Sequence, residues 1–219
     1  MDRHFDEELT ALKRHLMEMG TRAEETVRLA MLMLTARREA LSEEVFRLER
    51  QINEDEIVIE EEALRLIATH QPVASDLRLL TSMIKMVSEL ERIGDLAVNI
   101  AEVALNLIQQ PLLKPLIDLP RMAAIASQMV KDSLDSFVSR DPRKAKLVCE
   151  RDDEVDGLND HIFRELMTYM IGDPSSIQRA ISLILCARHL ERIADQATNI
   201  AENVIYIVEG KTIKHHHNA

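Results

Sequence analysis

The chain has 219 residues and a formal net charge of −11, with 46% hydrophobic and 30% charged residues. This length can bury a substantial core in one or two domains, and the hydrophobic fraction is too high for intrinsic disorder. Glycine and aromatic residues are scarce, which argues against sandwiches and barrels and predicts an all-helical fold. The acidic balance argues against nucleic-acid binding, because that binding depends on neutralising phosphates with lysine and arginine.

The sequence carries no signal for secretion or for a membrane span. The first nine residues are charged throughout, and the longest stretch without Asp, Glu, Lys or Arg is the eleven residues from Val103 to Leu113. Cys149 and Cys186 form no CxxC pair. We therefore expect a cytoplasmic protein whose two thiols are reduced and lie in or near the core.

Apolar residues recur at steps of three and four along six stretches, which is the pattern of amphipathic helices. Three of the six prolines fall within ten residues and interrupt this pattern, so we expect a linker there. The helices are expected over residues 6–36, 41–70, 76–107, 122–140, 142–170 and 176–208. The predicted organisation is a first three-helix bundle (1–110), a proline-rich linker (111–120), a second three-helix bundle (121–210) and a tail (211–219).

An internal repeat supports this division. The segment Glu91–Glu102 (ERIGDLAVNIAE) recurs 100 residues later as Glu191–Glu202 (ERIADQATNIAE), with nine of twelve positions identical. Helical periodicity alone would not reproduce identical residues on every face of a helix. The repeat therefore indicates duplication of a three-helix unit.

Each half also contains two pairs of carboxylates that are one helical turn apart. Such pairs repel each other, and cations that prefer oxygen ligands would offset the repulsion. If the two pairs of one half face each other, they could hold a cluster of metal ions bridged by shared carboxylates. The eight residues are Glu56, Glu60, Glu91, Asp95, Asp152, Asp156, Glu191 and Asp195. Weaker ligand candidates on the same strips are Asn99, Glu102, Asn199 and Glu202.

Simpler interpretations of these pairs stay open. Acid pairs at this spacing are common on solvated helix surfaces, and Arg92 and Arg192 offer salt bridges. The histidines add no ligands to the pairs, because His161 and His189 fit no paired ligand spacing, while His215–His217 are more typical of a flexible or added tail. No nucleotide-binding loop or catalytic triad pattern is present, so catalysis has no positive support.

Four stretches resemble the PhoU family, the bacterial accessory proteins of the high-affinity phosphate transport system. The first half carries Gln71–Arg78 (QPVASDLR) and Glu89–Asp95 (ELERIGD). The second half carries Leu166–Met170 (LMTYM) and Cys186–Asp195 (CARHLERIAD). The resemblance extends over nearly the whole chain with both halves in order, and it implies two tandem three-helix bundles related by internal pseudo-symmetry.

The resemblance further implies a regulatory adaptor without catalytic activity, which restrains phosphate uptake and the phosphate-starvation response. The implied partners are the ATPase subunit of the phosphate ABC transporter and the sensor histidine kinase, through which alone the protein would reach the membrane. A homodimer or a larger oligomer is expected. The family's metal motif maps onto the four carboxylate pairs and implies multinuclear clusters of iron or zinc, with manganese or magnesium as alternatives. Glu60 stands where the family more usually has Asp.

Two other classes of function remain open from the residues alone. One is a carboxylate-bridged di-metal enzyme of unknown substrate, which would lose turnover in a Glu91→Ala variant. The other is a purely structural helical adaptor, in which Glu91→Ala and Glu191→Ala would leave partner binding intact.

Overall fold

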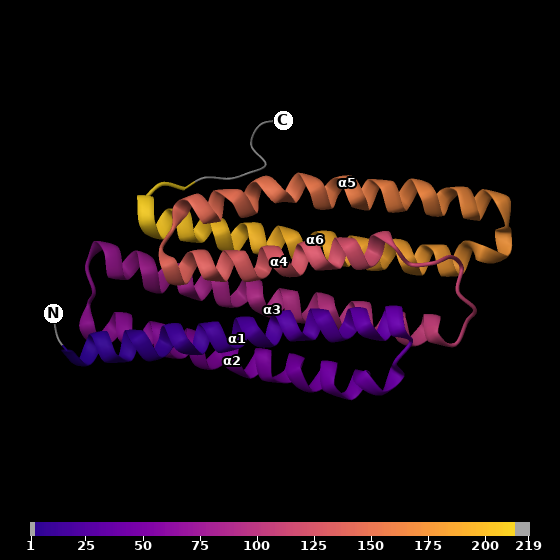
Figure 1. The fold of residues 1–219 in the computed structure, drawn as a ribbon. Coiled ribbons are helices and arrows are strands. Elements are labelled where there is room, and N and C mark those ends of the chain that lie inside the picture. The colour runs from indigo at the N-terminus through magenta and orange to yellow at the C-terminus, as the bar shows by residue number, and fades with distance from the viewer. Residues whose placement is uncertain (1–2, 213–219) are drawn as a thin grey trace.

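The computed structural model describes residues 3–212, which form six long helices in two groups of three (Figure 1). The all-helical expectation and the two three-helix bundles are confirmed. The long helices are α1 (Arg3–Ala36), α2 (Ser42–His70), α3 (Ala74–Ile108), α4 (Asp118–Ser139), α5 (Pro142–Gly172) and α6 (Ile177–Glu209). Two short 3-10 turns, η1 (Glu39–Leu41) and η2 (Pro174–Ser176), precede α2 and α6. The histidines at 215–217 lie outside the described residues.

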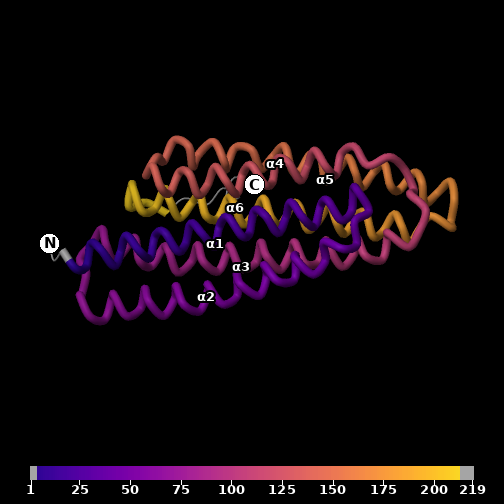
Figure 2. Tube along the Cα trace, turned by 60° about the horizontal axis from the view of Figure 1, so that its bottom comes forward, coloured from indigo at the N-terminus to yellow at the C-terminus, as the bar shows by residue number. Residues whose placement is uncertain are grey.

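The helices of each half pack against one another, and the two halves meet through α3 against α6 and α1 against α4. Helices α2 and α5 lie on opposite outer sides of the molecule, so neither is covered by the other half (Figures 1 and 2). We call the contact between α2 and α3 the first seam and the contact between α5 and α6 the second seam. Among the described helices, none combines the length and the apolar character needed to cross a membrane.

The core follows the apolar stripes of the sequence. The two central helices are buried along much of their length, and Ile93, Ile100, Ile193 and Ile200 are completely shielded from solvent. Each fully buried side chain of this size contributes about 1.5–3 kcal/mol to folding, so these stripes hold the two bundles together. The expectation of reduced thiols in the core is confirmed, because Cys149 and Cys186 are both free and buried.

The linker is shorter than expected. Helix α4 begins at Asp118, which leaves Pro120 in its first turn, where a residue needs no backbone N–H for helical hydrogen bonding. Two arginines hold the start of the linker, Arg37 just after α1 and Arg179 of α6. Arg37 donates to the carbonyl of Gln110 at 2.7 Å, and Arg179 donates to the carbonyl of Pro111 at 3.2 Å.

Candidate metal centres

The first candidate centre lies in the seam between α2 and α3. Glu56 of α2 accepts a hydrogen bond from Ser88 of α3, and the negative charges of Glu91 and Asp95 lie close enough to interact with it. Gly94 allows the two helices to approach here, since a Cβ atom at this position would lie 3.2 Å from Cδ1 of Ile52. The structure therefore brings three predicted ligands together from two helices.

Glu91 is the most perturbed carboxyl group of this centre. Burial raises its pKa to about 7, with further contributions from the charges of Asp95 and Glu56 and from a hydrogen bond with Asp95. Near neutral pH the Glu91 carboxyl group is therefore partly protonated. A bound cation would replace this proton and neutralise the same charges. The charge of Glu60 also acts on Glu56 and raises its pKa.

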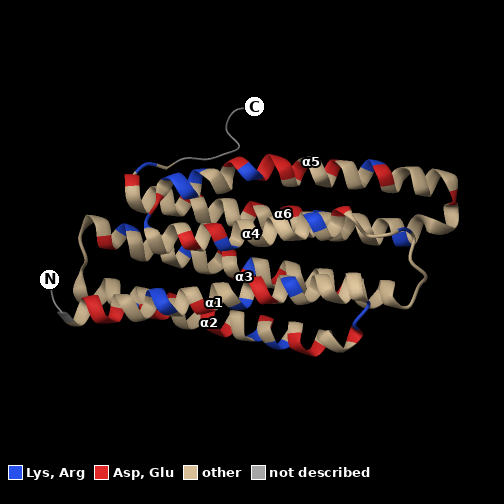
Figure 3. Ribbon diagram, in the orientation of Figure 1, with Lys and Arg blue, Asp and Glu red and all other residues tan. Residues whose placement is uncertain are grey.

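The second candidate centre lies in the seam between α5 and α6, along a run of acidic residues on α5 (Figure 3). Burial raises the pKa of Glu191, and the charges of Asp195 and Asp156 raise it further. Arg188 and Arg192 act in the opposite direction. The predicted carboxylates of both helices are therefore neighbours here as well.

Asp152 is the deepest of the predicted ligands, with 1% of its surface exposed. The thiol of Cys149, one turn away, interacts with the charges of Asp152 and Glu202, and burial together with these charges raises its pKa to about 12. Asp152 and Glu202 therefore lie on the same part of the seam between α5 and α6. Because the Cys149 thiol stays protonated, we do not include it among the ligands.

One of the weaker candidates has a different role. The side-chain amide of Asn199 donates to Oε2 of Glu89 at 3.3 Å, across the contact between α3 and α6. Asn199 therefore joins the two halves of the molecule. Burial raises the pKa of Glu89, and the hydrogen bond from Asn199 partly compensates for this. Glu102 is exposed and Asn99 is partly exposed on α3.

Two residues of α2 that the sequence analysis did not include, Glu49 and Asn53, offer further oxygen ligands. The Asn53 side chain donates to Glu49 at 2.5 Å, and its own Oδ1 is buried without a hydrogen-bond partner. An amide oxygen in this state is a ready ligand for a hard cation. The signal was in the helical register. At a spacing of 103 residues, the buried residues Val45, Ile52, Ile59 and Ala63 of α2 match Val148, Val155, Ile162 and Leu166 of α5. This register pairs Glu49 with Asp152 and Asn53 with Asp156.

The donor set of both centres fits metal binding, because it consists of carboxylate and amide oxygens from two facing helices. Side chains of the two centres would have to rotate for their oxygen atoms to surround an ion. Within residues 3–212, single ligand atoms from three His, Cys, Asp or Glu residues come within 4.8 Å of one another at one place, formed by Asp118, His161 and Glu165. His161 fits no paired ligand spacing along the sequence, and the structure brings it close to Asp118, which lies on another helix.

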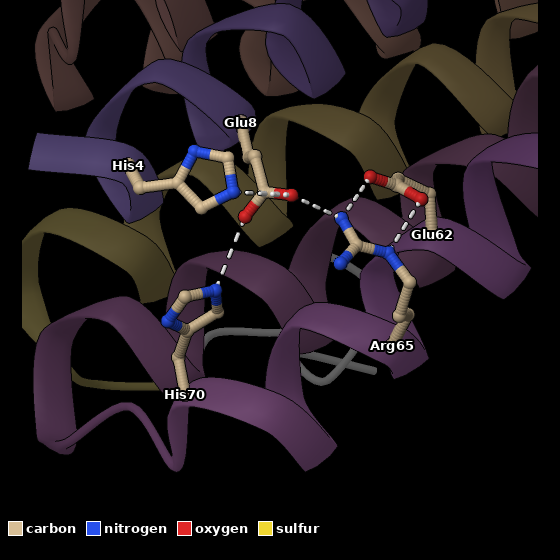
Figure 4. Close-up of polar contacts among 5 residues, drawn as sticks. All are labelled: His4, Glu8, Glu62, Arg65 and His70. Atoms are coloured by element: carbon tan, nitrogen blue, oxygen red, sulfur yellow. Dashed lines mark hydrogen bonds and ion pairs between the residues drawn. The ribbon is translucent and has the colours of Figure 1, made fainter. Parts of the chain in front are cut away.

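A further polar cluster joins the start of α1 to the end of α2 (Figure 4). Glu8 accepts a hydrogen bond from Arg65 at 2.6 Å and contacts His70 at 3.1 Å, while His4 lies 3.6 Å away. Arg65 also donates to both oxygens of Glu62. Because the arginine already balances the carboxylates, this cluster ties two helices together and leaves no position for a cation.

Known proteins share both the sequence and the fold of this chain. The PhoU domain matches residues 16–104 and 119–204, one match in each half. The phosphate-specific transport system accessory protein PhoU homolog of Aquifex aeolicus is 44% identical over 210 residues, which cover 96% of this chain and 95% of that protein. The homolog of Pseudomonas aeruginosa is 38% identical over 218 residues, covering 98% of this chain and 89% of that protein.

Two crystal structures show the same architecture. PhoU from Pseudomonas aeruginosa superposes with a TM-score of 0.92 at 39% identity, over 94% of this chain and all of that one. The phosphate transport system regulatory protein PhoU from Streptococcus pneumoniae gives a TM-score of 0.87 at 28% identity, over 96% of this chain and 99% of that one. These relatives are named as accessory and regulatory proteins, not as enzymes. The chain therefore belongs to the PhoU family.

Proposed function

We propose that this protein is a negative regulator of high-affinity phosphate uptake and of the phosphate-starvation response. It acts in the cytoplasm as a metal-binding adaptor between the ATPase subunit of the phosphate ABC transporter and the sensor histidine kinase. The observation that carries the proposal is the similarity to phosphate transport accessory proteins over nearly the entire length of the chain. Both halves take part in this similarity, so the adaptor would use the whole molecule.

The carboxylate centres supply a second argument. Glu91, with a pKa of about 7, and its neighbours Asp95 and Glu56 form a group of negative charges that is costly without a counter-ion. Iron or zinc, with manganese or magnesium as alternatives, would neutralise these charges and cross-link α2 to α3. Asp152, Asp156, Glu191 and Asp195 would do the same for α5 and α6. The role of such ions in the adaptor is structural and electrostatic.

The position of the centres suits an adaptor. Each seam is formed in part by an outer helix, α2 or α5, which the other half does not cover. A cation in either seam would reduce the negative charge of the outer face and fix the spacing of its helices. Both changes would alter how a partner meets that face.

Deletion of the gene tests the regulatory proposal. We expect the deletion to switch on a phosphate-starvation reporter in phosphate-rich medium, and the wild-type protein to switch it off again. A Glu91→Gln variant should restore repression poorly, while a variant at Glu61, an exposed acid of the same bundle, should restore it fully. Reporter output that is unchanged by the deletion would contradict the proposal.

Partner binding is tested separately by capture of the protein from cells grown at high and at low phosphate. The transporter ATPase subunit and the histidine kinase should be recovered with the wild-type protein. Loss of either partner with Glu91→Gln and Glu191→Gln would support a metal-dependent adaptor. Full retention of both partners would favour the purely structural adaptor.

A further inference from the structure

A third group of ligand-type side chains lies apart from the two seams, where α4 begins beside α5. Asp118 is the first residue of α4, and His161 and Glu165 stand one helical turn apart on α5. One ligand atom from each residue lies within 4.8 Å of the other two. Asp118 and His161 are 43 positions apart in sequence, and the packing of α4 against α5 brings them together.

The chemistry of this group differs from that of the carboxylate centres. One imidazole nitrogen and two carboxylate oxygens form the type of ligand set that binds zinc and related transition metals. An ion about 2.1 Å from each ligand atom would hold the three atoms about 3.4 Å apart in a tetrahedral arrangement. The observed separation of at most 4.8 Å can close to this value through small side-chain rotations. A water molecule would take the fourth position.

Lys114 of the linker holds Glu165 in position for this role. The lysine is largely buried, with 9% of its side chain exposed, and its ammonium group forms an ion pair with Oε2 of Glu165. This ion pair leaves the other carboxylate oxygen of Glu165 as the candidate metal ligand. A carboxylate that binds a metal through one oxygen is commonly fixed in this way by a hydrogen bond to its other oxygen.

The corresponding junction of the first half shows the contrast. There, the start of α1 and the end of α2 are joined by Glu8 and Arg65, and a guanidinium group fills the space between the carboxylates (Figure 4). In the second half, a histidine stands beside the two acids, and the cation that pairs with Glu165 is Lys114. The first junction thus joins its acids through an arginine, whereas the second places an imidazole among its acids.

We propose that Asp118, His161 and Glu165 bind one divalent transition-metal ion of the zinc class. The ion would tie the start of α4 to α5, beside the linker that joins the two halves. This site is separate from the two carboxylate centres and does not depend on the proposed regulatory function.

The test uses the full-length protein with His215–His217 changed to alanine, which removes competing histidines. Glu91→Gln and Glu191→Gln are added to weaken the two carboxylate centres. A calorimetric titration with Zn²⁺ should then show one ion bound per chain. Co²⁺ should give the visible absorption of a four- or five-coordinate site with a nitrogen ligand.

Variants of the site complete the test. His161→Ala and Glu165→Gln should each weaken Zn²⁺ binding by at least about tenfold, and His161→Ala should abolish the Co²⁺ spectrum. The matched control is His4→Ala, an exposed histidine of α1, which should change neither measurement. Circular dichroism establishes that each variant is folded. Absence of Zn²⁺ binding in the starting protein, or equal binding by His161→Ala and His4→Ala, would overturn the proposal.

Discussion

The two halves of the molecule carry the same repeat but balance their carboxylates differently. In the second half, Arg188 and Arg192 both oppose the rise in the pKa of Glu191. In the first half, the position equivalent to Arg188 is Ser88, which donates a hydrogen bond to Glu56, and Arg92 alone opposes the rise at Glu91. One substitution between the repeats thus removes a full positive charge from the first centre.

Burial is the main cause of the rise in the pKa of Glu91 to about 7, and the first centre has one arginine fewer to oppose this rise. Without a second arginine, the first centre lowers its charge by retaining a proton. In the second centre, two arginines offset part of the negative charge, so protonation of Glu191 relieves less repulsion there. A duplicated structural unit can therefore hold two centres with the same ligand types but different proton and metal affinities.

The largest expected effect comes from removing ligands of one half at a time. Glu91→Gln with Asp95→Asn should reduce metal affinity in the first half by more than about 100-fold, because ligands are lost and not merely reoriented. Glu191→Gln with Asp195→Asn should do the same in the second half. Equilibrium dialysis with Zn²⁺ or Mn²⁺ measures both, in protein with the tail histidines changed to alanine. Identical stoichiometry in both double variants and the wild type would contradict this assignment.

The pH dependence of metal binding should distinguish the halves next. A cation at the first centre must displace the proton of Glu91, whose pKa is about 7. Below this value, affinity should fall by up to about tenfold per pH unit. The second centre should show a shallower dependence between pH 6 and 8. Titrations of the two double variants isolate each centre, and equal slopes would show that the arginines do not separate them.

Stability without metal gives a smaller effect of defined sign. Folded Glu91 has a pKa of about 7 against an ordinary value of 4.5, so the folded state binds its proton more tightly than the unfolded state does. The free energy of unfolding should therefore decrease as pH rises from 4.5 to 7. Glu91→Gln removes this penalty and should be more stable than the wild type at pH 8 by roughly 1 kcal/mol, allowing for solvent screening. Urea unfolding in the presence of EDTA measures it, and a Glu91→Gln protein less stable than the wild type at pH 8 would refute the sign.

The smallest effect tests the arginine itself. Arg188→Ser gives the second half the residue that the first half has at the equivalent position. The pKa of Glu191 should rise further, because an exposed positive charge is removed near the carboxyl group. Carbon-13 NMR titration of the glutamate carboxyl groups detects such a shift. Arg179→Ser, on the same helix, is the control and should leave Glu191 unchanged.

Much of the fold could be predicted from the sequence, because helical periodicity and proline positions are local signals. The repeat also indicated which helices correspond in the two halves. Helix α4 begins earlier than the pattern predicts, because Pro120 fits the first helical turn without loss of a helical hydrogen bond. The approach of Asp118 to His161 could not be predicted, since the two residues lie on different helices and are distant in sequence.

The candidate centres were predictable in part. The one-turn spacing placed Glu91 and Asp95 on one face of a helix, and the structure brings Glu56 beside them. Asn53 is not part of a carboxylate pair, and its sequence position alone does not show that its amide oxygen is buried. The burial of this oxygen depends on how α2 packs against α3, which the sequence of α2 alone does not determine.

Metal analysis of the protein tests the central claim most directly. The full-length chain with His215–His217 changed to alanine should be purified from cells without added metal. Elemental analysis should find iron, zinc or manganese at one or more ions per half, and in each double variant the content should fall by the ions of one carboxylate centre. Added metal should also raise the melting temperature of the metal-depleted wild type. A metal-free protein whose melting temperature does not respond to iron, zinc or manganese would contradict the account.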